Sequence, residues 1–402
     1  MMLGLLLARA GVDVIVLEKH ADFLRDFRGD TIHPSTLEVM HELGLLDGLL
    51  RLPHQKVAEI GWQIEDFALT LADFRHLPVR APFIAFMPQW DFLDFLAREA
   101  GRYPSFHFMM RAEATDLVEE SGRMAGVHVT TPAGPVTIRA DLVVGADGRS
   151  SVVREKAGLP VEDFGAPMDV LWFRLSRAPS DPPQSLGRIV AGRIFIMLNR
   201  GDYWQCGYVI AKGQADQVRA AGLQAFREGI VRLTPHMKDR VNELVTWDDV
   251  KLLTVQVNRL TRWYRPGLLC IGDAAHAMSP VAGVGINLAV QDAVAAANIL
   301  AVPLRERRVT VEDLRRVQKR REWPTRVTQR IQLAVQNRVI RSVLSATAPV
   351  KPPLVAWMLG RFPRLRRIPG RLIGLGVRPE HVRSEPSDDH GDAFGAGARM
   401  LS

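Results

Sequence analysis

The chain has 402 residues, 47% of them hydrophobic and 24% charged, a composition that fits a globular protein with room for two domains. Its net charge is +8, but the basic residues are spread along the chain with local excesses only at 305–321 and 361–371, so we expect no nucleic-acid partner. We expect no transmembrane segment, because we see no apolar run of the ~20 residues that a bilayer span takes. Cys206 and Cys270 lie in apolar strand-like runs, as expected of reduced thiols in the cytoplasm.

The N-terminal residues predict the second half of a dinucleotide-binding βαβ unit. Residues 1–10 have a helical pattern, and residues 12–17 form a buried strand that ends at Glu18. Glu18, with Lys19 beside it, is placed to bond a ribose hydroxyl. A strand and a Gly-x-Gly-x-x-Gly loop should precede such a helix, so we expect that the sequence is truncated at its N-terminus. The alternative is that Met1 is the true start and that a dinucleotide binds poorly.

Strand and helix patterns continue to an Asp-Gly turn. Residues 57–64 and 67–71 alternate like a hairpin, and Gln89 opens an amphipathic helix. A further strand ends in Asp-Leu-Val-Val-Gly-Ala and is followed by Asp147, Gly148 and then Arg-Ser-Ser. Asp147 is therefore placed at a strand end, where open α/β sheets bind ligands. An Asp-Gly pair alone is a common turn, whereas this whole string is specific.

The sequence pattern of residues 161–263 differs from that of the preceding segment and predicts a unit rich in β-strands. Trp172, Met197 and Trp204 alternate on its strands, and we expect some of them to line an apolar pocket suited to an aromatic or polycyclic substrate. The alternative is that these side chains belong to the core. The strand patterns lie at 169–175, 188–198, 203–210 and 250–257.

The most informative string is RPGLLCIGDAAHAMSPVAGVGINLAVQ, at residues 265–291. An apolar strand ends at Gly272, and Asp273 places a carboxylate at its C-terminal end. Gly283 and Gly285 lie just before a helix. Bare backbone there can approach a flat ring, and the helix dipole can face the electron-rich edge of that ring.

The rest of the chain is predicted to be helical and then disordered. Residues 287–300 and 311 to about 344 read as helices, the second with a kink at Pro324. Residues 361–371 are basic with apolar side chains interleaved, which predicts packing on the body of the protein or a weak contact with a membrane surface. Residues 384–402 are polar and Gly-rich, as is typical of disorder.

Both motif strings resemble those of the class A FAD-dependent aromatic monooxygenases, the para-hydroxybenzoate hydroxylase-like family. The resemblance covers residues 1 to about 300 and implies an α/β fold. It implies a Rossmann-like FAD-binding domain that lacks its first strand and Gly-rich loop, an inserted β-sheet substrate domain and a helical C-terminus. The implied division assigns 1–56, 88–160 and 264–305 to the FAD-binding domain, 57–87 and 161–263 to the substrate domain, 306–383 to a helical region and 384–402 to a disordered tail.

The resemblance also implies which residues hold the cofactor. In that family the aspartate that corresponds to Asp273 holds the ribityl chain, and the loop after it lies along the isoalloxazine ring. Arg28 is the best candidate for a pyrophosphate contact and Asp30 a second one, with a solvated charged loop as the alternative. The expected FAD contacts are Glu18, Lys19, Arg28, Asp30, Gln89, Asp147, Gly148, Gly272, Asp273, Pro280, Gly283, Gly285 and Asn287.

The reaction that the resemblance implies uses NADH or NADPH to reduce FAD. The reduced FAD reacts with dioxygen to give a C4a-hydroperoxide, which hydroxylates an aromatic or polycyclic substrate. Arg149 and Arg154 are candidates for the phosphates of the nicotinamide cofactor. No catalytic side chain and no metal site are assigned. Two alternatives stay open: another flavoprotein oxidoreductase on the same scaffold, such as a halogenase or a prenyl reductase, and a truncated relative without catalysis.

Overall fold

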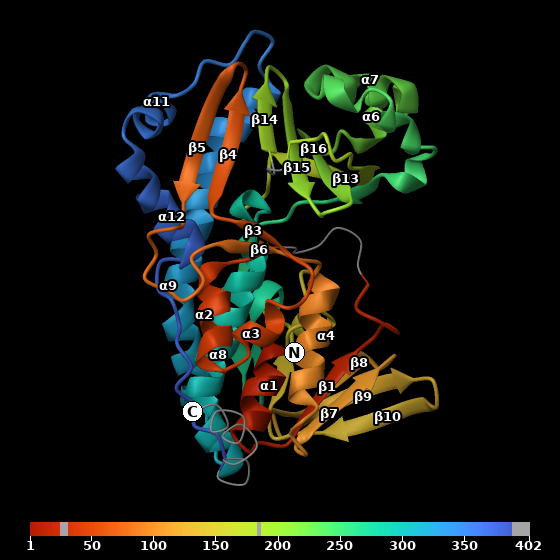
Figure 1. Ribbon diagram of the computed structural model, residues 1–402. Helices are drawn as coiled ribbons and strands as arrows, with labels where there is room; N and C mark the ends of the chain where they lie inside the picture. Colours follow the sequence, from red (N-terminus) through yellow and green to blue (C-terminus); the bar gives the residue numbers. More distant parts are fainter. Residues whose placement is uncertain (25–30, 183–185, 388–402) are drawn as a thin grey trace.

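A computed structural model describes residues 1–24, 31–182 and 186–387 of the chain. These residues form a lower body of helices and short strands, and an upper part built on one large β-sheet (Figure 1). The long helix α9 (Val311–Val335) runs beside both parts. The arrangement confirms the predicted α/β class and the helical C-terminal region.

Two small sheets, each with one parallel pair of strands, carry the strands of the predicted nucleotide-binding segments. In the first sheet, β1 (Val14–Glu18) pairs with β7 (Phe106–Met110). In the second, β11 (Val143–Gly145) pairs with β20 (Leu268–Cys270). No strand among the described residues hydrogen-bonds to both sheets. Helix α1 (Met2–Arg9) precedes β1, as predicted, and its Leu5, Leu6 and Leu7 are buried in the largest described apolar core.

Helix α8 (Gly285–Arg305) is the core helix of the lower body, where it packs against α1 and α9. Together with the turn before it, the stretch Val281–Arg305 is long and apolar enough to cross a membrane. This corrects our expectation that no apolar run reaches that length. Of its most apolar window, however, 67% is buried inside the protein, as in the core helix of a globular domain.

The upper part is a seven-stranded sheet in the order β17-β13-β16-β15-β14-β4-β5 (Figure 1). Its neighbours are antiparallel except β14 and β4, which run parallel and join distant parts of the chain. One face of the sheet packs on α6 and α7 through a separate apolar core. The elements are β4 (Glu59–Ile64), β5 (Phe67–Asp73), β13 (Met168–Ser176), β14 (Leu186–Val190), β15 (Arg193–Asn199), β16 (Tyr203–Ala211), β17 (Lys251–Leu253), α6 (Ala215–Ala220) and α7 (Leu223–Leu233).

One strand of the upper sheet differs from its prediction. The single strand expected over residues 188–198 is a hairpin of β14 and β15, because the chain turns at Gly192 with a φ of +73°. Only glycine adopts such a backbone readily.

The remaining elements complete the lower body. Three-stranded sheets form from β8, β9 and β10 and from β2, β3 and β6, and β12 pairs with β18. Helix α4 starts at Gln89, as predicted. The bounds are α2 (Pro34–Glu42), α3 (Leu46–Leu49), α4 (Gln89–Ala100), α5 (Val152–Lys156), β2 (Thr31–Ile32), β3 (Gln55–Val57), β6 (Ile84–Phe86), β8 (Glu113–Glu120), β9 (Arg123–Thr131), β10 (Gly134–Arg139), β12 (Val161–Asp163), β18 (Asn258–Leu260) and β19 (Tyr264–Arg265).

The helix predicted from residue 311 to about 344 is present as α9, a π-helical turn and α10 (Arg341–Leu344). Helix α9 contains Pro324. Two shorter helices, α11 (Leu354–Arg361) and α12 (Arg367–Gly374), come after the prolines that end this segment.

The last described residues are ordered against α1, although we expected a disordered tail from Ser384 onward. The Ser387 amide donates to the carbonyl of Arg9 at 3.0 Å. The Arg9 guanidinium donates to the carbonyl of Ser384 at 2.7 Å. These two hydrogen bonds hold residues 384–387 in place in spite of their polar composition. Residues 388–402 lie outside the described part of the chain.

Candidate active site

The Asp-Gly and Gly-Asp turns lie next to each other. Strands β11 and β20 are parallel, and Gly145 is opposite Cys270 in their register. Because both strands end at one edge of the sheet, Asp147 and Asp273 leave it on the same side, and both line one cavity. Two motifs that are separated by more than a hundred residues in the sequence therefore meet at one place.

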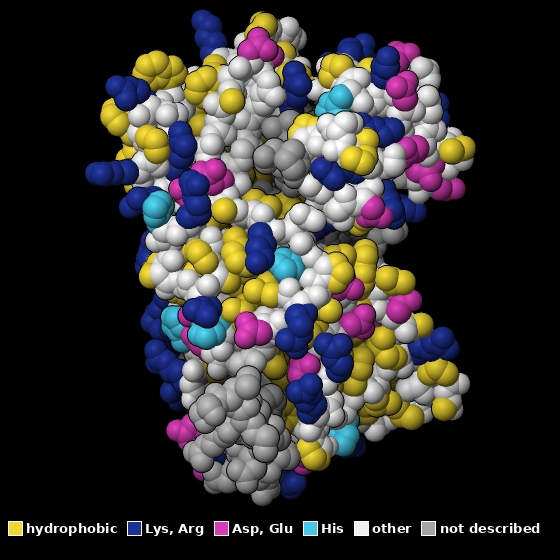
Figure 2. Space-filling view, viewed as in Figure 1, with side chains coloured by type: hydrophobic (Ala, Val, Ile, Leu, Met, Phe, Trp, Pro, Cys, Tyr) yellow, Lys and Arg dark blue, Asp and Glu magenta, His cyan; other side chains and the backbone are white. Residues whose placement is uncertain are grey.

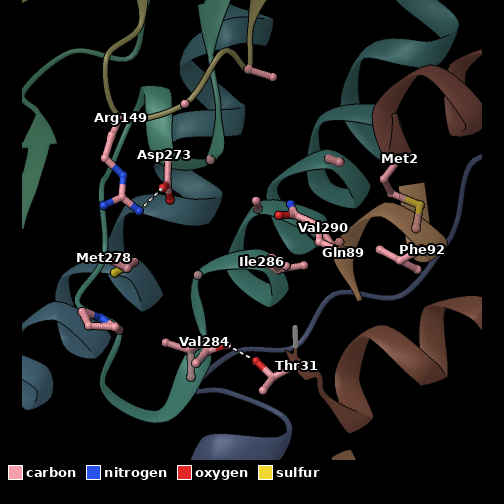
Figure 3. A pocket seen from close by; sticks show the side chains of 18 of the residues that line it. Met2, Thr31, Gln89, Phe92, Arg149, Asp273, Met278, Val284, Ile286 and Val290 are labelled. Carbon is pink, nitrogen blue, oxygen red and sulfur yellow. Dashed lines mark hydrogen bonds and ion pairs between the residues drawn. The ribbon is translucent and has the colours of Figure 1, made fainter. Parts of the chain in front are cut away.

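Two arginines of the first turn connect it to the second. Arg149 Nη2 lies 3.8 Å from Asp273 Oδ2, and Figure 3 shows this ion pair in the wall of the cavity. Arg154 donates to the main-chain oxygens of Arg149 at 2.7 Å and of Ala274 at 3.3 Å. Both groups of the ion pair are partly exposed, so it orients the Asp273 carboxylate more than it stabilises the fold.

The Asp147 carboxylate is engaged at the start of α5. Its Oδ1 accepts a hydrogen bond from the Ser151 hydroxyl at 2.5 Å, and its Oδ2 accepts one from the Val153 amide at 3.1 Å. Ser151 in turn accepts from the Arg154 amide and caps the helix. Asp147 thus fixes the turn, and Gly148, with a φ of +87°, carries the backbone past the cavity.

The buried carboxylate of Asp292 hydrogen-bonds to the turn at Gly272. Gly272 has a φ of +58°, a conformation that favours glycine. Its amide donates to Oδ2 of Asp292 at 3.0 Å. An added Cβ would lie 3.0 Å from the Cβ of Ala289, so a side chain here would crowd α8. This turn sets the direction in which Asp273 leaves the strand.

The loop from Pro280 to Gly285 forms another wall of the cavity. Within it, Gly283 has a φ of +62°, and its carbonyl accepts a hydrogen bond from Thr31 Oγ1 at 2.9 Å (Figure 3). A Cβ on Gly283 would lie only 2.5 Å from that hydroxyl. No signal in the sequence marks Thr31 as a partner, because it is 252 positions away along the chain.

Asn287 does not line the cavity, contrary to its prediction as a cofactor contact. The residue is 4% exposed, and both its side-chain oxygen and its side-chain nitrogen hydrogen-bond to other groups of the protein. Its Oδ1 accepts from the His33 amide at 2.9 Å and from the Thr36 hydroxyl at 2.7 Å. Its Nδ2 donates to the carbonyl of Thr31 at 3.3 Å. Asn287 therefore ties α8 to the β2 segment behind the loop.

The other predicted cofactor contacts that the structure describes line one cavity of about 2010 Å³. Figure 3 shows Asp273 and Arg149 on one side of it, and Gln89, Met2 and Phe92 on the other. Arg28 and Asp30 lie outside the described residues. The predicted residues that line the cavity are Glu18, Lys19, Gln89, Asp147, Gly148, Gly272, Asp273, Pro280, Gly283 and Gly285.

The large sheet supplies an apolar wall of the same cavity. Trp172 lines it, as predicted. Met197 borders the cavity, but its side chain is buried in the core on the opposite face of the sheet together with Trp204, which does not line the cavity. Trp204 is fully buried on the opposite face of the sheet, where its Nε1 donates to Asp181 Oδ2 at 2.8 Å. The correction follows from strand geometry, because neighbouring residues of a strand face opposite sides, and Gln205 rather than Trp204 faces the cavity.

Metal and thiol chemistry have no support in the described residues. No group of three His, Cys, Asp or Glu side chains in this part of the chain has the geometry of a metal site. Cys206 and Cys270 are free and buried, as predicted. Burial raises the pKa of Cys270 to about 12, with the charge of Asp147 adding to the effect, so its thiol stays protonated and unreactive.

The arrangement fits a bound flavin dinucleotide. Gly283 and Gly285 leave bare backbone at the N-terminus of the 21-residue helix α8, where the helix dipole favours electron-rich groups. Asp273 Oδ1 lies 3.9 Å from the position that a Cβ on Gly285 would take, so the carboxylate and the loop share one surface. Glu18 stands at the end of β1 on the same cavity. The residues present therefore match the cofactor that the motifs imply.

Comparison with known proteins supports a flavin dinucleotide as the cofactor. Residues 1–331 match the family described as FAD binding domain. The 6-methylpretetramide 4-monooxygenase of Streptomyces rimosus is 33% identical over 389 residues, which cover 95% of this chain and 91% of that protein. The dialkyldecalin synthase of Streptomyces rugosporus is 26% identical over 311 residues, which cover 73% of this chain and 61% of that protein.

A solved structure shows the same fold. The crystal structure of p-nitrophenol 4-monooxygenase from Pseudomonas putida DLL-E4 superposes with a TM-score of 0.75 at 18% identity, and the match covers 94% of this chain and 95% of that one. The family match confirms FAD as the cofactor, and the geometry of the two motifs agrees with it. The chain therefore belongs to the FAD binding domain family, and it is a FAD-dependent monooxygenase.

Proposed function

We propose that this monooxygenase hydroxylates a polycyclic aromatic substrate in the cytoplasm, with NADH or NADPH as its electron donor. The observation that carries the proposal is that one cavity joins the two acidic turns to the apolar face of the seven-stranded sheet. We assign that sheet, within residues 57–87 and 161–263, to the substrate domain. Residues 1–56, 88–160 and 264–305 would then bind the cofactor.

The size and lining of the cavity support a large apolar substrate. Its volume of about 2010 Å³ exceeds the roughly 300–1,000 Å³ of a site for one drug-sized ligand. A dinucleotide and a second molecule therefore fit together. The sheet contributes apolar side chains with few polar groups, which suits stacked rings: Met168, Val170, Trp172, Ile189, Ile194, Ile196, Leu198 and Val209.

The chain's own residues would orient the cofactor and exclude water from it. Asp273, held by Arg149, would accept hydrogen bonds from the ribityl hydroxyls. The loop from Pro280 to Gly285 would lie along the ring. Glu18 and Lys19 would contact the adenosine half, and Gln89 would donate to an oxygen of the chain between the two halves. When bound, FAD supplies the redox and oxygen-transfer chemistry, so no side chain need act as a nucleophile.

The test measures oxygen uptake and NADPH oxidation by the full chain after loading with FAD. We expect uptake to be stimulated by phenols with several fused rings, including 6-methylpretetramide, more than by single-ring phenols. Trp172→Ala should raise the KM for the best substrate about tenfold, because it removes an aromatic contact of ~1 kcal/mol or more from the wall. Trp204→Phe, on the opposite face of the sheet, is the matched control and should leave that KM within twofold.

Two results would contradict the proposal. NADPH oxidation with substrate reduction and no oxygen uptake would favour the reductase alternative. Equal KM changes in the Trp172 and Trp204 variants would show that the sheet does not form the substrate wall. FAD retention in each variant, measured by absorbance, separates loss of the cofactor from loss of substrate binding.

A further inference from the structure

Helices α11 and α12 present apolar side chains to solvent. Leu354 is 75% exposed, Trp357 is 61% exposed and Ile368 is 67% exposed. Ala356 and Leu359 on the inner side of α11 are buried, so the helix is already anchored to the protein. Large apolar residues are normally buried in a domain, and a cluster of exposed ones marks an interaction surface. We call Leu354–Ile368, with Arg371, the apolar–basic surface.

The same surface carries a strong positive charge. Between Glu322 and Glu380 the sequence has no Asp or Glu, whereas it has 11 Lys or Arg. Figure 2 shows hydrophobic and basic side chains mixed at the upper left of the molecule, where α11 and α12 lie in Figure 1. Five of these basic residues belong to the apolar–basic surface: Arg361, Arg364, Arg366, Arg367 and Arg371. The other six are Arg326, Arg330, Arg338, Arg341, Lys351 and Arg378.

The charge on this surface is not neutralised by its neighbours. Arg361, Arg364 and Arg371 are exposed, and in the part of the chain that the structure describes no carboxylate forms an ion pair with them. The nearby β5 carboxylate of Asp73 pairs with Arg75 instead. Glu65, at the tip of the β4–β5 hairpin, accepts the amide of Val350 at 2.9 Å. Positive charge therefore stays available to an external anion.

We propose that the apolar–basic surface docks the protein on an anionic phospholipid bilayer. Trp357 and Phe362 suit the membrane interface, and aliphatic Leu354 and Ile368 suit the acyl boundary below it. The guanidinium groups of the surrounding arginines would bind headgroup phosphates. A nucleic acid would leave the aliphatic side chains in water, so the chemistry of the surface favours lipid.

Docking in this way would bring the substrate cavity close to the bilayer. Ala356 and Leu359 of α11 and Leu372 and Ile373 of α12 line that cavity from the inner side. The outer side of the same helices would face lipid. An apolar substrate dissolved in the membrane would then have a short path to the active site; this consequence rests on the proposed function, whereas the docking itself does not.

The test uses the full chain and sedimentation with vesicles. We expect binding to vesicles of phosphatidylcholine mixed with phosphatidylglycerol, little binding to phosphatidylcholine alone, and release at high salt because the attraction is screened. Replacing Arg361, Arg364 and Arg371 together by Gln should lower the partition coefficient on the order of 100-fold, since each basic residue near the surface contributes about fivefold. Trp357→Ser should lower it on the order of tenfold.

The matched control removes the same charge from the opposite end of the upper part. Arg219, Arg232 and Lys238 are exposed on or beside α6 and α7, and their joint replacement by Gln should change binding less than twofold. All replaced side chains are exposed, so the melting temperature should be unchanged and checks folding. Absence of binding to anionic vesicles, or equal loss in both triple variants, would overturn the proposal. Salt-sensitive binding that Trp357→Ser leaves unchanged would overturn apolar insertion.

Discussion

At the scale of single residues, Asp292 is the charge on which the site geometry depends most. Its side chain is fully buried, and its carboxylate accepts from the Gly272 amide, from His276 Nε2 at 2.5 Å and from Arg321 Nε at 2.9 Å. Burial acts to raise the pKa of Asp292, but the charges and hydrogen bonds of His276 and Arg321 outweigh it and lower that pKa. Arg321 also bonds Glu380 at 3.1 Å, so the network reaches the C-terminal segment.

Removal of this one charge should be costly. In Asp292→Asn the side chain keeps its shape, but Arg321 loses a partner for its buried charge, and breaking such a pair costs about 3–5 kcal/mol. We expect a loss of that size in the free energy of unfolding, measured by urea titration. Asp313→Asn, which removes a helix-capping carboxylate at the exposed start of α9, should cost only about 1 kcal/mol. Similar losses in both variants would show that Asp292 has no special role.

At the scale of elements, sequence alone predicted the strand–turn–helix units but not their long-range contacts. The strand before Asp273 and the helix after Gly285 follow from local periodicity and glycine placement. The face that Trp204 occupies does not, because both faces of the large sheet are apolar and neither carries a polar signal. The hydrogen bond between Thr31 and Gly283 could not be predicted either, because no local pattern indicates a partner that far along the chain.

The turn at Gly283 offers a sharp test at this scale. Gly283→Ala would place a Cβ in a left-handed backbone and against Thr31 Oγ1, so we expect a stability loss of about 1–3 kcal/mol. FAD binding, measured by the fluorescence change on titration, should weaken with it. Adding Thr31→Ala should restore part of the loss, because it removes the clash but not the backbone strain.

The neighbouring position provides the control for that variant. Ala282 already has a φ of +64°, so Ala282→Gly relieves strain and should leave stability unchanged or raise it by up to ~1 kcal/mol. If thermal melting shows that Gly283→Ala is as stable as Ala282→Gly, the close approach of the loop to β2 is not a constraint on the site.

At the scale of the whole molecule, His33 connects three distant segments. It stands before α2, its amide donates to Asn287 of α8, and its Nδ1 lies 2.8 Å from the carbonyl of Ile373 in α12. The side chain is fully buried, and burial lowers its pKa to about 4, while the bond to Ile373 acts in the opposite direction. Protonation of this one imidazole would therefore oppose the packing of α12 against the lower body.

Stability should consequently depend on pH below neutrality. The folded protein keeps His33 neutral, whereas the unfolded chain binds a proton below about pH 6.5, so this contribution is present at neutral pH and is lost as pH falls from 6.5 toward 4. At about pH 5 the loss should be about 2 kcal/mol relative to pH 7.5, measured by urea unfolding. His33→Gln should reduce that difference by about 2 kcal/mol. The buried N-terminal amine of Met1, whose pKa burial lowers, loses stability in the same window and is unchanged in the variant. His236→Gln should have a smaller effect, because His236 also has a lowered pKa but is exposed. Asp73, Asp181, Asp292 and Asp313 have lowered pKa values, so their contributions are lost only in more acidic solution and do not obscure this window. An unchanged pH dependence in His33→Gln would mean that the three segments do not meet at a neutral imidazole.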